Sequence, residues 1–559
     1  MATVPQQENH SYLGAPYGLA AWLLTKDHKR IAILYLISIT IFFAVGGMFA
    51  AGIRLELTTP QGDLWSPDMY NKLFTLHGVV MIFFFLIPSI PAVLGNFMLP
   101  IMIGAKDLAF PRINLLSWYI YVVGAIITLA AVFAGGLDTG WTFYTPYSSI
   151  SSETAVTTAA LGVFVTGFSS ILTGLNFIVT VHRMRAPGMT WFRLPLFVWA
   201  QYATSLVMIL GTPVIAITVL LVAAERALHL GIFDPKLGGD PVLFQHLFWF
   251  YSHPAVYIMI LPGMGVMSEL VAAVSRKQVF GYGFVAFSSL AIAILGFLVW
   301  GHHLFVSSQS IYAGLVFSII TMLVAVPSAV KTFNWLSTLY KSRIQFTTPM
   351  LWAMGVVSLF ISGGLSGVWL GQSAPDIQLH DTFFVVAHFH LIMAGAALFG
   401  VFGGTAYWFP KMFGRMMNDT LGKAHFWLTF ITYYGTFFPM HYVGLTGQMR
   451  RLYDPYQYDW LKPVQPMNQF ITISAIILGA AQILFFVNFF WSAFKGKRAT
   501  ENPWASNGLE WTTPSAPPHG NWPGEIPTVK RWPYEYGNPE GANDHVMQHE
   551  PLLPSERPH

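Results

Sequence analysis

Six histidines lie inside or at the ends of long apolar segments, where an imidazole is well suited to bind a transition metal. They are His77, His253, His302, His303, His388 and His390. An ionisable side chain at the centre of a membrane helix costs at least about 2.5–3.5 kcal/mol, so such residues usually serve a site or a pathway. The chain has no cysteine, which excludes thiolate ligands and iron–sulfur clusters. Histidine, carboxylate or thioether must therefore hold any metal.

Helix geometry divides these histidines between different centres. His388 and His390 are two residues apart, about 200° around a helix, so they point in opposite directions and must serve two centres. His253 and Tyr257 are four residues apart and share one face. His302 and His303 are adjacent at a helix end, where irregular backbone can turn both inward. Three imidazoles beside a phenol suit copper.

The elements that must position these residues are membrane helices. The chain is 54% hydrophobic and 10% charged, whereas an average soluble domain is about 25% charged. Apolar runs of about 20 residues recur along it. They begin near residues 31, 72, 113, 155, 195, 244, 280, 309, 349, 383, 424 and 468. The sequence predicts an all-α polytopic membrane protein with about twelve spans.

The distribution of basic residues predicts the orientation. Lys and Arg gather in alternate loops, which the positive-inside rule assigns to the cytoplasm together with both termini. This orientation places the six histidines in the outer half of the membrane. Arg450 and Arg451 lie on the outer side and break the pattern. The small net charge of +4 is spread over loops and indicates no nucleic-acid partner.

Three regions follow from these patterns. Residues 1–30 are a cytoplasmic N-terminal segment, residues 31–496 the twelve-helix domain, and residues 497–559 a cytoplasmic tail. The tail is rich in Pro, Trp and Gly and has no periodicity, which is typical of an extended strap or a partly disordered segment. His182, His425 and His441 are interpreted as loop or interfacial residues and His246 as the start of a span, so none of them is assigned a metal.

Several strings resemble a known family in order and spacing. They are LHGVVMIFFF, GNFMLPIMIGAKDLAFPRIN, QHLFWFYSHPAVYIMILPG, WGHHLF, AVPSAVK and HDTFFVVAHFHLIMAG. Together they resemble subunit I of the haem–copper oxidases, and specifically the cytochrome c oxidase branch, over residues 30 to 512. The combination is far more specific than any one motif.

The resemblance implies a role for each histidine of the set. His77 and His390 would be the axial ligands of a low-spin haem, and His388 the proximal ligand of a high-spin haem. Copper B would be held by His253, His302 and His303. Tyr257 matches the tyrosine that is covalently linked to the first copper histidine in the family and that supplies an electron and a proton when the O–O bond breaks.

Further residues match sites around the haems. Arg54 matches the arginine that contacts the formyl group of low-spin haem A. Trp141, Arg450 and Arg451 resemble the cluster that binds haem propionates, which would explain the basic outer loop. His380 and Asp381 resemble ligands of magnesium, with a further ligand expected from subunit II. Glu56 is assigned to a bound calcium or sodium ion.

Two polar tracks resemble the proton channels of the family. The D channel would use Asp107 at the inner mouth, with Asn96, Asn114, Ser169, Ser170 and Asn176. The K channel would use Lys331, Ser328 and Ser268, leading toward Tyr257, with serine at position 328 where a threonine is usual. Lone polar residues can equally well hold helices together. A lysine in an apolar span more often has a function.

The chain departs from the family at Ala255. Many relatives have a glutamate there that ends the D channel, whereas this chain reads YSHPAVY. In one subgroup the preceding Tyr-Ser pair is thought to take over. Tyr251 and Ser252 lie about one helical turn before Ala255, so their hydroxyl groups could reach the same cavity. We expect proton pumping with Tyr251 as the donor.

The resulting prediction is the catalytic subunit of a respiratory oxidase that reduces O2 to water and pumps protons, with haem A in both haem sites. Its partners would be a subunit II with copper A, subunit III, membrane lipid and a donor, either cytochrome c or a periplasmic haem protein. Ubiquinol-oxidising relatives carry a histidine at the position of Met69, so the methionine favours cytochrome c or a periplasmic haem protein, and ubiquinol is the alternative donor. A secondary transporter and a nitric oxide reductase are rival functions. Ala255 and the long C-terminal tail favour localisation in a bacterial inner membrane. Haem O, small subunits and supercomplex membership stay open.

Overall fold

The computed structural model describes residues 11–14, 18–59, 61–307, 309–537 and 544–552. Within these residues the chain is helical, and extended segments meet only in isolated bridges. The helices are α1 (Leu19–Leu23), α2 (His28–Glu56), α3 (Pro67–Val79), α4 (Asn96–Met102), α5 (Pro111–Phe133), α6 (Val156–Arg183), α7 (Leu196–Leu228), α8 (Pro241–Ser275), α9 (Tyr282–Gly296), α10 (Ile311–Leu323), α11 (Ala325–Leu339), α12 (Thr348–Leu370), α13 (Ser373–Leu379), α14 (Phe383–Phe389), α15 (Ala396–Phe413), α16 (Asp419–Phe437), α17 (Pro439–Leu445) and α18 (Gln465–Lys495).

Several of these helices join into longer spans. Two π-helical segments, Val80–Leu86 and Ser89–Gly95, lie between α3 and α4, and a third, His390–Gly395, connects α14 to α15. In the described part of the chain, ten helical stretches are long and apolar enough to cross a membrane. The two other predicted spans correspond to the 15-residue α9 and to the 19-residue α16. Each predicted start lies within a few residues of a helix start, and the all-α polytopic fold is confirmed.

Local sequence explains where these spans begin. Ser66, Thr382 and Asn418 each precede a helix and accept a hydrogen bond from a backbone N–H of its first turn, which satisfies a donor that has no partner within the helix. Pro67 follows Ser66 at the first helical position, where a proline costs no hydrogen bond. The polar start of each span is thereby fixed before its apolar stretch enters the bundle.

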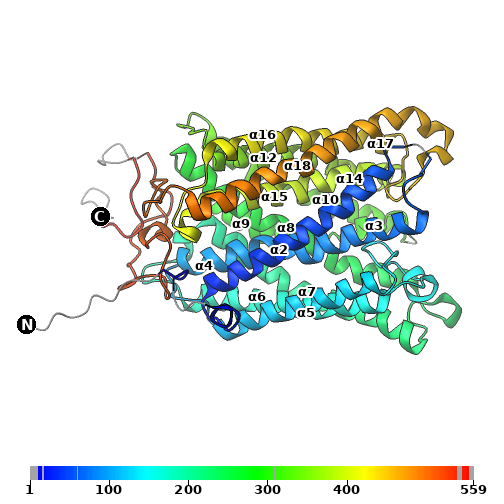
Figure 1. Cartoon of the computed structure of the whole chain (residues 1–559), viewed down its shortest axis with the longest axis horizontal. Coiled ribbons are helices and arrows are strands. Elements are labelled where there is room, and N and C mark those ends of the chain that lie inside the picture. The colour runs from blue at the N-terminus through cyan, green and yellow to red at the C-terminus, as the bar shows by residue number, and fades with distance from the viewer. Residues whose placement is uncertain (1–10, 15–17, 60, 308, 538–543, 553–559) are drawn as a thin grey trace, which may run out of the picture.

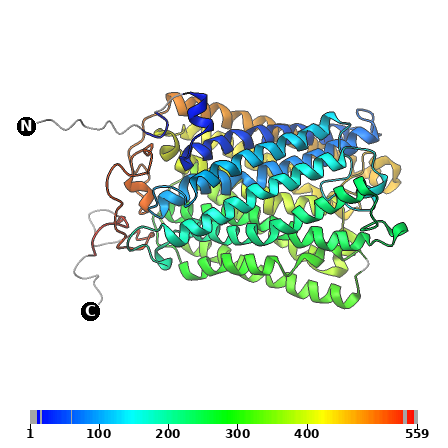
Figure 2. The ribbon, with the colours of Figure 1, turned by 90° about the horizontal axis from the view of Figure 1, so that it is seen from below.

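The helices form one elongated bundle with α8 at its centre (Figures 1 and 2). The 18-residue apolar stretch of α8 is 100% buried inside the protein, whereas the corresponding stretch of the α10–α11 span is 11% buried. On α10 the single buried residue is Gly314, and Ile311 is 90% exposed. A helix that is apolar all round and uncovered by protein is stable in hydrocarbon and not in water. The chain is thus an integral membrane protein.

The first described residues and the tail lie at the same end of the bundle, on the left in Figures 1 and 2. We call this the tail end, and the opposite end, which bears the loops before α3 and after α17, the far end. The described residues of the tail pack against the helices: Lys411 Nζ donates to the carbonyl oxygens of Glu501 at 2.8 Å and Thr513 at 2.5 Å, and Arg276 pairs with Asp544. The described residues of the tail therefore lie across one end of the bundle (Figures 1 and 2).

Candidate metal and proton-transfer sites

Three histidine side chains converge near the far end. His253 lies on α8, and His302 and His303 lie on a 3₁₀ helix, Trp300–Leu304, that follows α9. His253 Nδ1 and His302 Nε2 each lie 3.1 Å from His303 Nε2. Three nitrogens bonded to one ion at about 2.0–2.1 Å and near-tetrahedral angles lie about 3.3 Å apart. The spacing fits a shared metal ion, and within the described residues no other three His, Asp or Glu side chains come this close.

Neighbouring side chains fix these imidazole rings. The ring of Trp249 is parallel to that of His303, with centroids 3.6 Å apart, and Thr321 Oγ1 lies 3.1 Å from His302 Nδ1. Partners of this kind set ring orientation and the choice of ligating nitrogen. Tyr257 lies one turn along α8 from His253, with ring centroids 4.9 Å apart. A phenol thus lies beside the three imidazoles.

His388 has its own supporting shell on α12. Its Nδ1 lies 2.8 Å from the carbonyl oxygen of Gly363 and 3.2 Å from Ser366 Oγ. An N–H at Nδ1 that donates to this carbonyl leaves Nε2 as the free ligand atom. A Cβ at Gly367 would lie 2.7 Å from His388 Cε1, so the ring fits because that residue has no side chain.

His77 and His390 face each other across a gap that fits an iron. Their rings are parallel to within 7°, with centroids 6.4 Å apart. The Nδ1 atoms lie 2.9 Å from the backbone oxygens of Gly46 and Val386, respectively, which leaves both Nε2 atoms free to bind a metal. Two imidazoles bonded to one iron at about 2.0–2.1 Å would place their centroids roughly 6 Å apart. His390 also stacks on Phe437, whereas His388 contacts α12.

Two arginine side chains, Arg54 and Arg450, have buried N–H groups without a partner among the described residues. Arg54 is buried and donates through Nη2 to the carbonyl oxygen of Asn468 at 2.9 Å and to Thr472 Oγ1 at 3.1 Å, while its Nε and Nη1 have no partner among the described residues. Arg450 likewise has an unpartnered buried Nε. Unmade hydrogen bonds of a buried guanidinium are costly, so these atoms fit a bound oxygen-bearing group.

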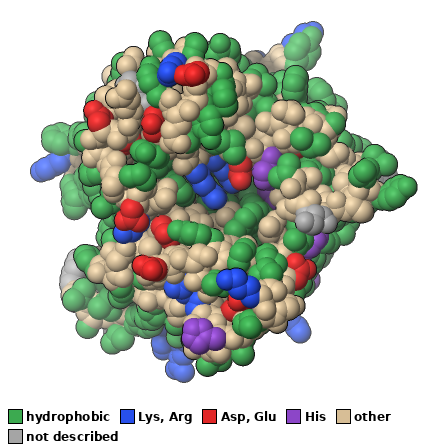
Figure 3. Space-filling view, turned by 90° about the vertical axis from the view of Figure 1, so that its right-hand side faces the viewer, with side chains coloured by type: hydrophobic (Ala, Val, Ile, Leu, Met, Phe, Trp, Pro, Cys, Tyr) green, Lys and Arg blue, Asp and Glu red, His purple; other side chains and the backbone are tan. Residues whose placement is uncertain are grey.

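A charged cluster lies at the far end, where charged side chains and a histidine surround a central hollow (Figure 3). Arg450 pairs with Asp381, and Asp381 Oδ2 lies 3.8 Å from His380 Nε2. Burial raises the pKa of Asp381, but Arg450 and His380 outweigh it and hold that pKa below its usual range. Asp376, which the sequence reasoning missed, lies 3.4 Å from His380 Nδ1, and burial raises its pKa. Asp381 and His380 could bind one hard cation together with water.

Other residues assigned to cofactors lie around this end. The ring centroid of Trp141 lies 5.5 Å from that of Phe248 and 5.8 Å from that of Trp249, the residue that stacks on His303. Arg451 Nη2 donates to Thr142 Oγ1 at 3.5 Å. Glu56 is fully buried; one carboxylate oxygen accepts from the backbone N–H of Trp65 at 2.6 Å, and the other has no partner among the described residues.

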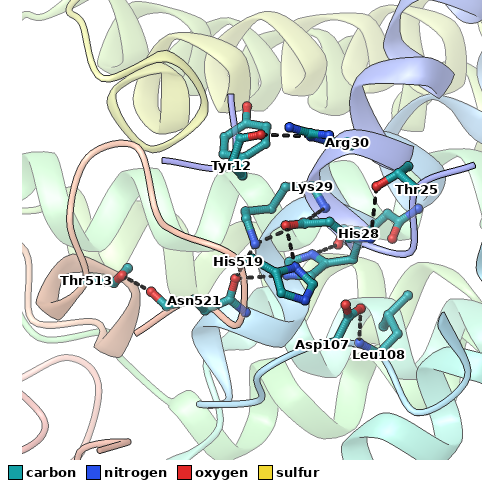
Figure 4. Close-up of polar contacts among 12 residues, drawn as sticks. Tyr12, Thr25, His28, Lys29, Arg30, Asp107, Leu108, Thr513, His519 and Asn521 are labelled. Atoms are coloured by element: carbon teal, nitrogen blue, oxygen red, sulfur yellow. Dashed lines mark hydrogen bonds and ion pairs between the residues drawn. The ribbon is translucent and has the colours of Figure 1, made fainter. Parts of the chain in front are cut away.

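Asp107 lies at the tail end within a polar cluster (Figure 4). His519 of the tail contacts Asp27 at 3.0 Å, and Asn521 accepts a hydrogen bond from Lys29 Nζ at 2.7 Å. Burial, followed by the negative charge of Asp27, raises the pKa of Asp107 to about 7. A carboxyl group with this pKa can both take up and release a proton near neutral pH.

The polar residues beyond Asp107 connect neighbouring helices. Asn96 and Asn114 exchange two side-chain hydrogen bonds of 3.1 and 2.9 Å, and Asn176 binds both the N–H and the carbonyl of Phe110 at 3.0 Å. Ser169 Oγ lies 3.0 Å from the hydroxyl of Tyr35. These contacts line one side of the bundle with exchangeable hydrogen-bonding groups.

A small cavity lies farther along the same side. Its lining includes Ser170, Thr212 and Tyr251, so a residue of the predicted track and the predicted donor open onto one space. Ala255 is buried one turn beyond Tyr251, and Ser252 Oγ is buried without a partner among the described residues. The cavity is lined mainly by apolar side chains, but the hydroxyl groups of Ser170 and Thr212 on its wall have no partner among the described residues and are suited to bind ordered water.

Lys331 is buried on α11. Its Nζ donates to Ser289 Oγ at 2.7 Å and to the carbonyl oxygen of Val285 at 3.2 Å. Ser289 was missed by the sequence reasoning because only the packing of α9 against α11 brings it near the lysine. Ser268 accepts a hydrogen bond from Trp335 Nε1 at 3.0 Å, and Ser328 lies half-buried one turn from Lys331.

One interpretation of a histidine was wrong. His425 is 2% exposed within α16, where its Nε2 lies 3.2 Å from Gln482 Oε1 and its ring packs on Trp352. It is therefore neither in a loop nor interfacial, because α16 begins six residues earlier and α18 supplies a polar partner for the imidazole. His182 is exposed at the end of α6, and His441 lies in the short α17.

Comparison with known proteins identifies the family. The family model described as "Cytochrome C and Quinol oxidase polypeptide I" matches residues 30–477. The chain is 45% identical over 513 residues to "Cytochrome c oxidase subunit 1" of Thermostichus vulcanus, an alignment that covers 91% of this chain and 92% of the relative. It is 38% identical over 551 residues to "Alternative cytochrome c oxidase subunit 1" of Bradyrhizobium diazoefficiens, covering 95% and 93%.

Among solved structures, a heme-copper terminal oxidase dimer shares the fold, with a TM-score of 0.69, 18% identity, and coverage of 84% of this chain and 85% of that one. The predicted resemblance is confirmed by these matches. The chain therefore belongs to the haem–copper oxidase subunit I family, as the catalytic, haem- and copper-holding subunit of a multi-subunit terminal oxidase.

Proposed function

We propose that this subunit reduces O2 to water with electrons from cytochrome c or a periplasmic haem protein, and that it couples the reaction to proton pumping. The observation that carries the proposal is the convergence of His253, His302 and His303 beside Tyr257 near the far end. Iron and copper, when bound, would supply the redox chemistry. The chain supplies ligands that hold the metals at fixed separation and a phenol that holds a proton beside them.

The assignment of ligands follows from which nitrogen each histidine leaves free. His388 would hold the high-spin haem through Nε2, since its Nδ1 is committed to α12. His77 and His390 would hold the low-spin haem between their parallel rings, and this haem would supply electron transfer without binding O2. His253, His302 and His303 would hold copper B.

The surroundings favour haem A and a magnesium ion. Two unpartnered nitrogens of Arg54 suit the oxygen of a formyl substituent, and Trp141, Arg450 and Arg451 suit carboxylates such as haem propionates. His380 and Asp381 would bind magnesium with a ligand from subunit II. The unpartnered carboxylate oxygen of Glu56 suits calcium or sodium.

The electron donor is proposed from the relatives and from one residue. Both curated relatives described above are named as cytochrome c oxidases. Met69, in the first turn of α3, occupies the position where quinol-oxidising relatives carry a histidine. A copper A subunit II would then pass electrons inward, with subunit III and smaller subunits completing the complex.

Protons would enter at the tail end, which we place in the cytoplasm of a bacterium, with the far end outside the inner membrane. One route would run from Asp107 past Asn96, Asn114, Asn176, Ser169 and Ser170 to Tyr251 and Ser252. Ser170 and Tyr251 line the same cavity, which supports the last step. A second route would pass Lys331. A Tyr251→Phe enzyme that pumps normally would contradict the role of Tyr251.

The first experiment is the optical spectrum of the purified, dithionite-reduced complex with and without carbon monoxide, together with iron and copper analysis. Two haem A signals, of which only one shifts with carbon monoxide, and copper in the protein are expected. Iron in place of copper would favour a nitric oxide reductase. A colourless, metal-free protein would refute the proposal and make a secondary transporter the remaining function. Oxidation of ubiquinol in place of cytochrome c would refute only the donor.

A further inference from the structure

Lys331 makes its hydrogen bonds to α9, although the resemblance points to a serine on α8. Its side chain is 1% exposed, and its Nζ donates to Ser289 Oγ at 2.7 Å and to the carbonyl oxygen of Val285 at 3.2 Å. A buried ammonium group must be satisfied by such partners. The first group able to exchange a proton with this lysine is therefore the hydroxyl of Ser289.

Ser268 is committed to other partners. Its hydroxyl donates to the carbonyl oxygen of Met264 at 2.9 Å and accepts from Trp335 Nε1 at 3.0 Å. A hydroxyl has a single proton to give, and here that proton is used within α8. Trp335 lies one turn from Lys331 toward the tail end, so Ser268 lies on the side of the lysine away from Tyr257.

Ser289 lies on the opposite side, toward the metals. The helix α9 begins shortly after Arg276, which pairs with Asp544 of the tail, and ends just before the 3₁₀ helix that carries His302 and His303. Ser289 is therefore one turn closer to the metal site than Val285. Gly296 is seven residues further on the same face, about 10 Å along the axis. A Cβ at Gly296 would lie 2.7 Å from Cδ2 of Tyr257. One face of α9 therefore leads from the lysine to the phenol.

The hydroxyl of Ser289 is also weakly held. Its contact to the Val285 carbonyl is 3.4 Å, longer than the usual 2.7–2.8 Å of an O–H···O hydrogen bond. By contrast, the neighbouring Ser288 donates to the same carbonyl at 2.7 Å. Ser289 can thus turn its proton away from the helix at little cost, whereas Ser288 cannot.

We propose that Ser289 is a proton-relay residue between Lys331 and Tyr257. Its Oγ accepts a proton from the Lys331 ammonium, so that an N–H bond breaks and an O–H bond forms. The original hydroxyl proton leaves to hydrogen-bonded water on the Tyr257 side, and rotation of the hydroxyl restores the starting state. This inference rests on the proposed proton route through Lys331, and it replaces Ser268 by Ser289 as the residue beside the lysine.

The test measures how fast the carbon-monoxide-binding haem is reduced in the purified complex, by anaerobic stopped flow. An electron that enters a buried site needs a compensating proton, so a blocked relay slows this step. Because Lys331 loses a buried partner, we expect Ser289→Ala to slow it at least about five-fold. The low-spin haem should be reduced at the unchanged rate, and Ser289→Thr should restore the fast phase.

Ser288→Ala is the matched control, since it removes a buried hydroxyl one residue away that does not contact the lysine. The relay would be overturned if the carbon-monoxide-binding haem were reduced at the same rate in Ser289→Ala and Ser288→Ala. It would also be overturned if only Ser268→Ala slowed this reduction. Slowing that Ser289→Thr does not restore would show a structural role only and would also overturn it. A Lys331→Met complex with normal kinetics would instead refute the proposed proton route itself. Intact reduced spectra of both haems exclude misfolding in every variant.

Discussion

The fit of His388 against α12 allows a specific perturbation, Gly367→Ala. An added Cβ would lie 2.7 Å from His388 Cε1, whereas ordinary contacts begin at 3.4 Å, so the ring must move by about 0.7 Å. Metal–imidazole bonds tolerate about 0.2 Å. The ring cannot swing freely, because Nδ1 is held by Gly363 and Ser366. Overpacking of about 1–3 kcal/mol corresponds to roughly five- to 150-fold weaker ligation.

The assay is the carbon monoxide difference spectrum of the reduced complex, with the low-spin haem as an internal standard. In Gly367→Ala the carbon-monoxide-binding haem should be largely lost or shifted, while the band held by His77 and His390 stays. Gly364→Ala is the matched control, because the nearest atom to its Cβ is Ile392 Cδ1 at 3.9 Å. An unchanged carbon-monoxide-binding haem in Gly367→Ala would refute the assignment of His388 as the ligand whose position α12 fixes.

Three further outcomes are expected. His303→Ala should lose copper and retain both haems in metal and haem analysis; retained copper would contradict the three-histidine site. Because burial raises the pKa of Asp107 to about 7 from 3.8, the unfolded state ionises first. The contribution of Asp107 to stability is therefore complete below about pH 4 and is lost as the pH rises through about 7. Asp107→Asn should make the melting temperature of the complex less dependent on pH between these two values. Asn521→Leu should remove one of the two partners of the buried Lys29, whose Nζ also lies 3.0 Å from Asp27 Oδ1, and destabilise tail docking by about 1–3 kcal/mol, measured as faster proteolysis of the tail than in the exposed control Glu525→Gln.

Sequence alone could predict the features that depend on local pattern. Apolar length predicts the spans, and the two-residue separation of His388 and His390 predicts that one helix contacts two centres. The supporting partners of these histidines could not be predicted in this way. The carbonyl oxygens of Gly46 and Gly363 become partners of His77 and His388 only through packing between helices far apart in sequence.

The same reason explains why the partners of Lys331 and the packing of the tail could not be predicted from the sequence. Ser289 and Ser288 are indistinguishable in sequence, and the facing of α9 and α11 decides which of them meets Lys331. The composition of the tail predicts a strap or disorder, yet its aromatic and polar residues find partners on the bundle, such as Trp504 Nε1 on the carbonyl of Tyr407 at 2.8 Å. Tertiary contacts supply the order that local propensity does not.

The contact between Lys29 and Asn521 has a consequence for biosynthesis. The two residues are 492 positions apart, so the first span leaves the ribosome long before its partner exists. Until Asn521 has been synthesised, the ammonium group of Lys29 lacks this partner, and the tail cannot yet pack against this end of the bundle. A truncated product would therefore lack the tail contacts that Lys29, Arg276 and Lys411 make at this end of the bundle.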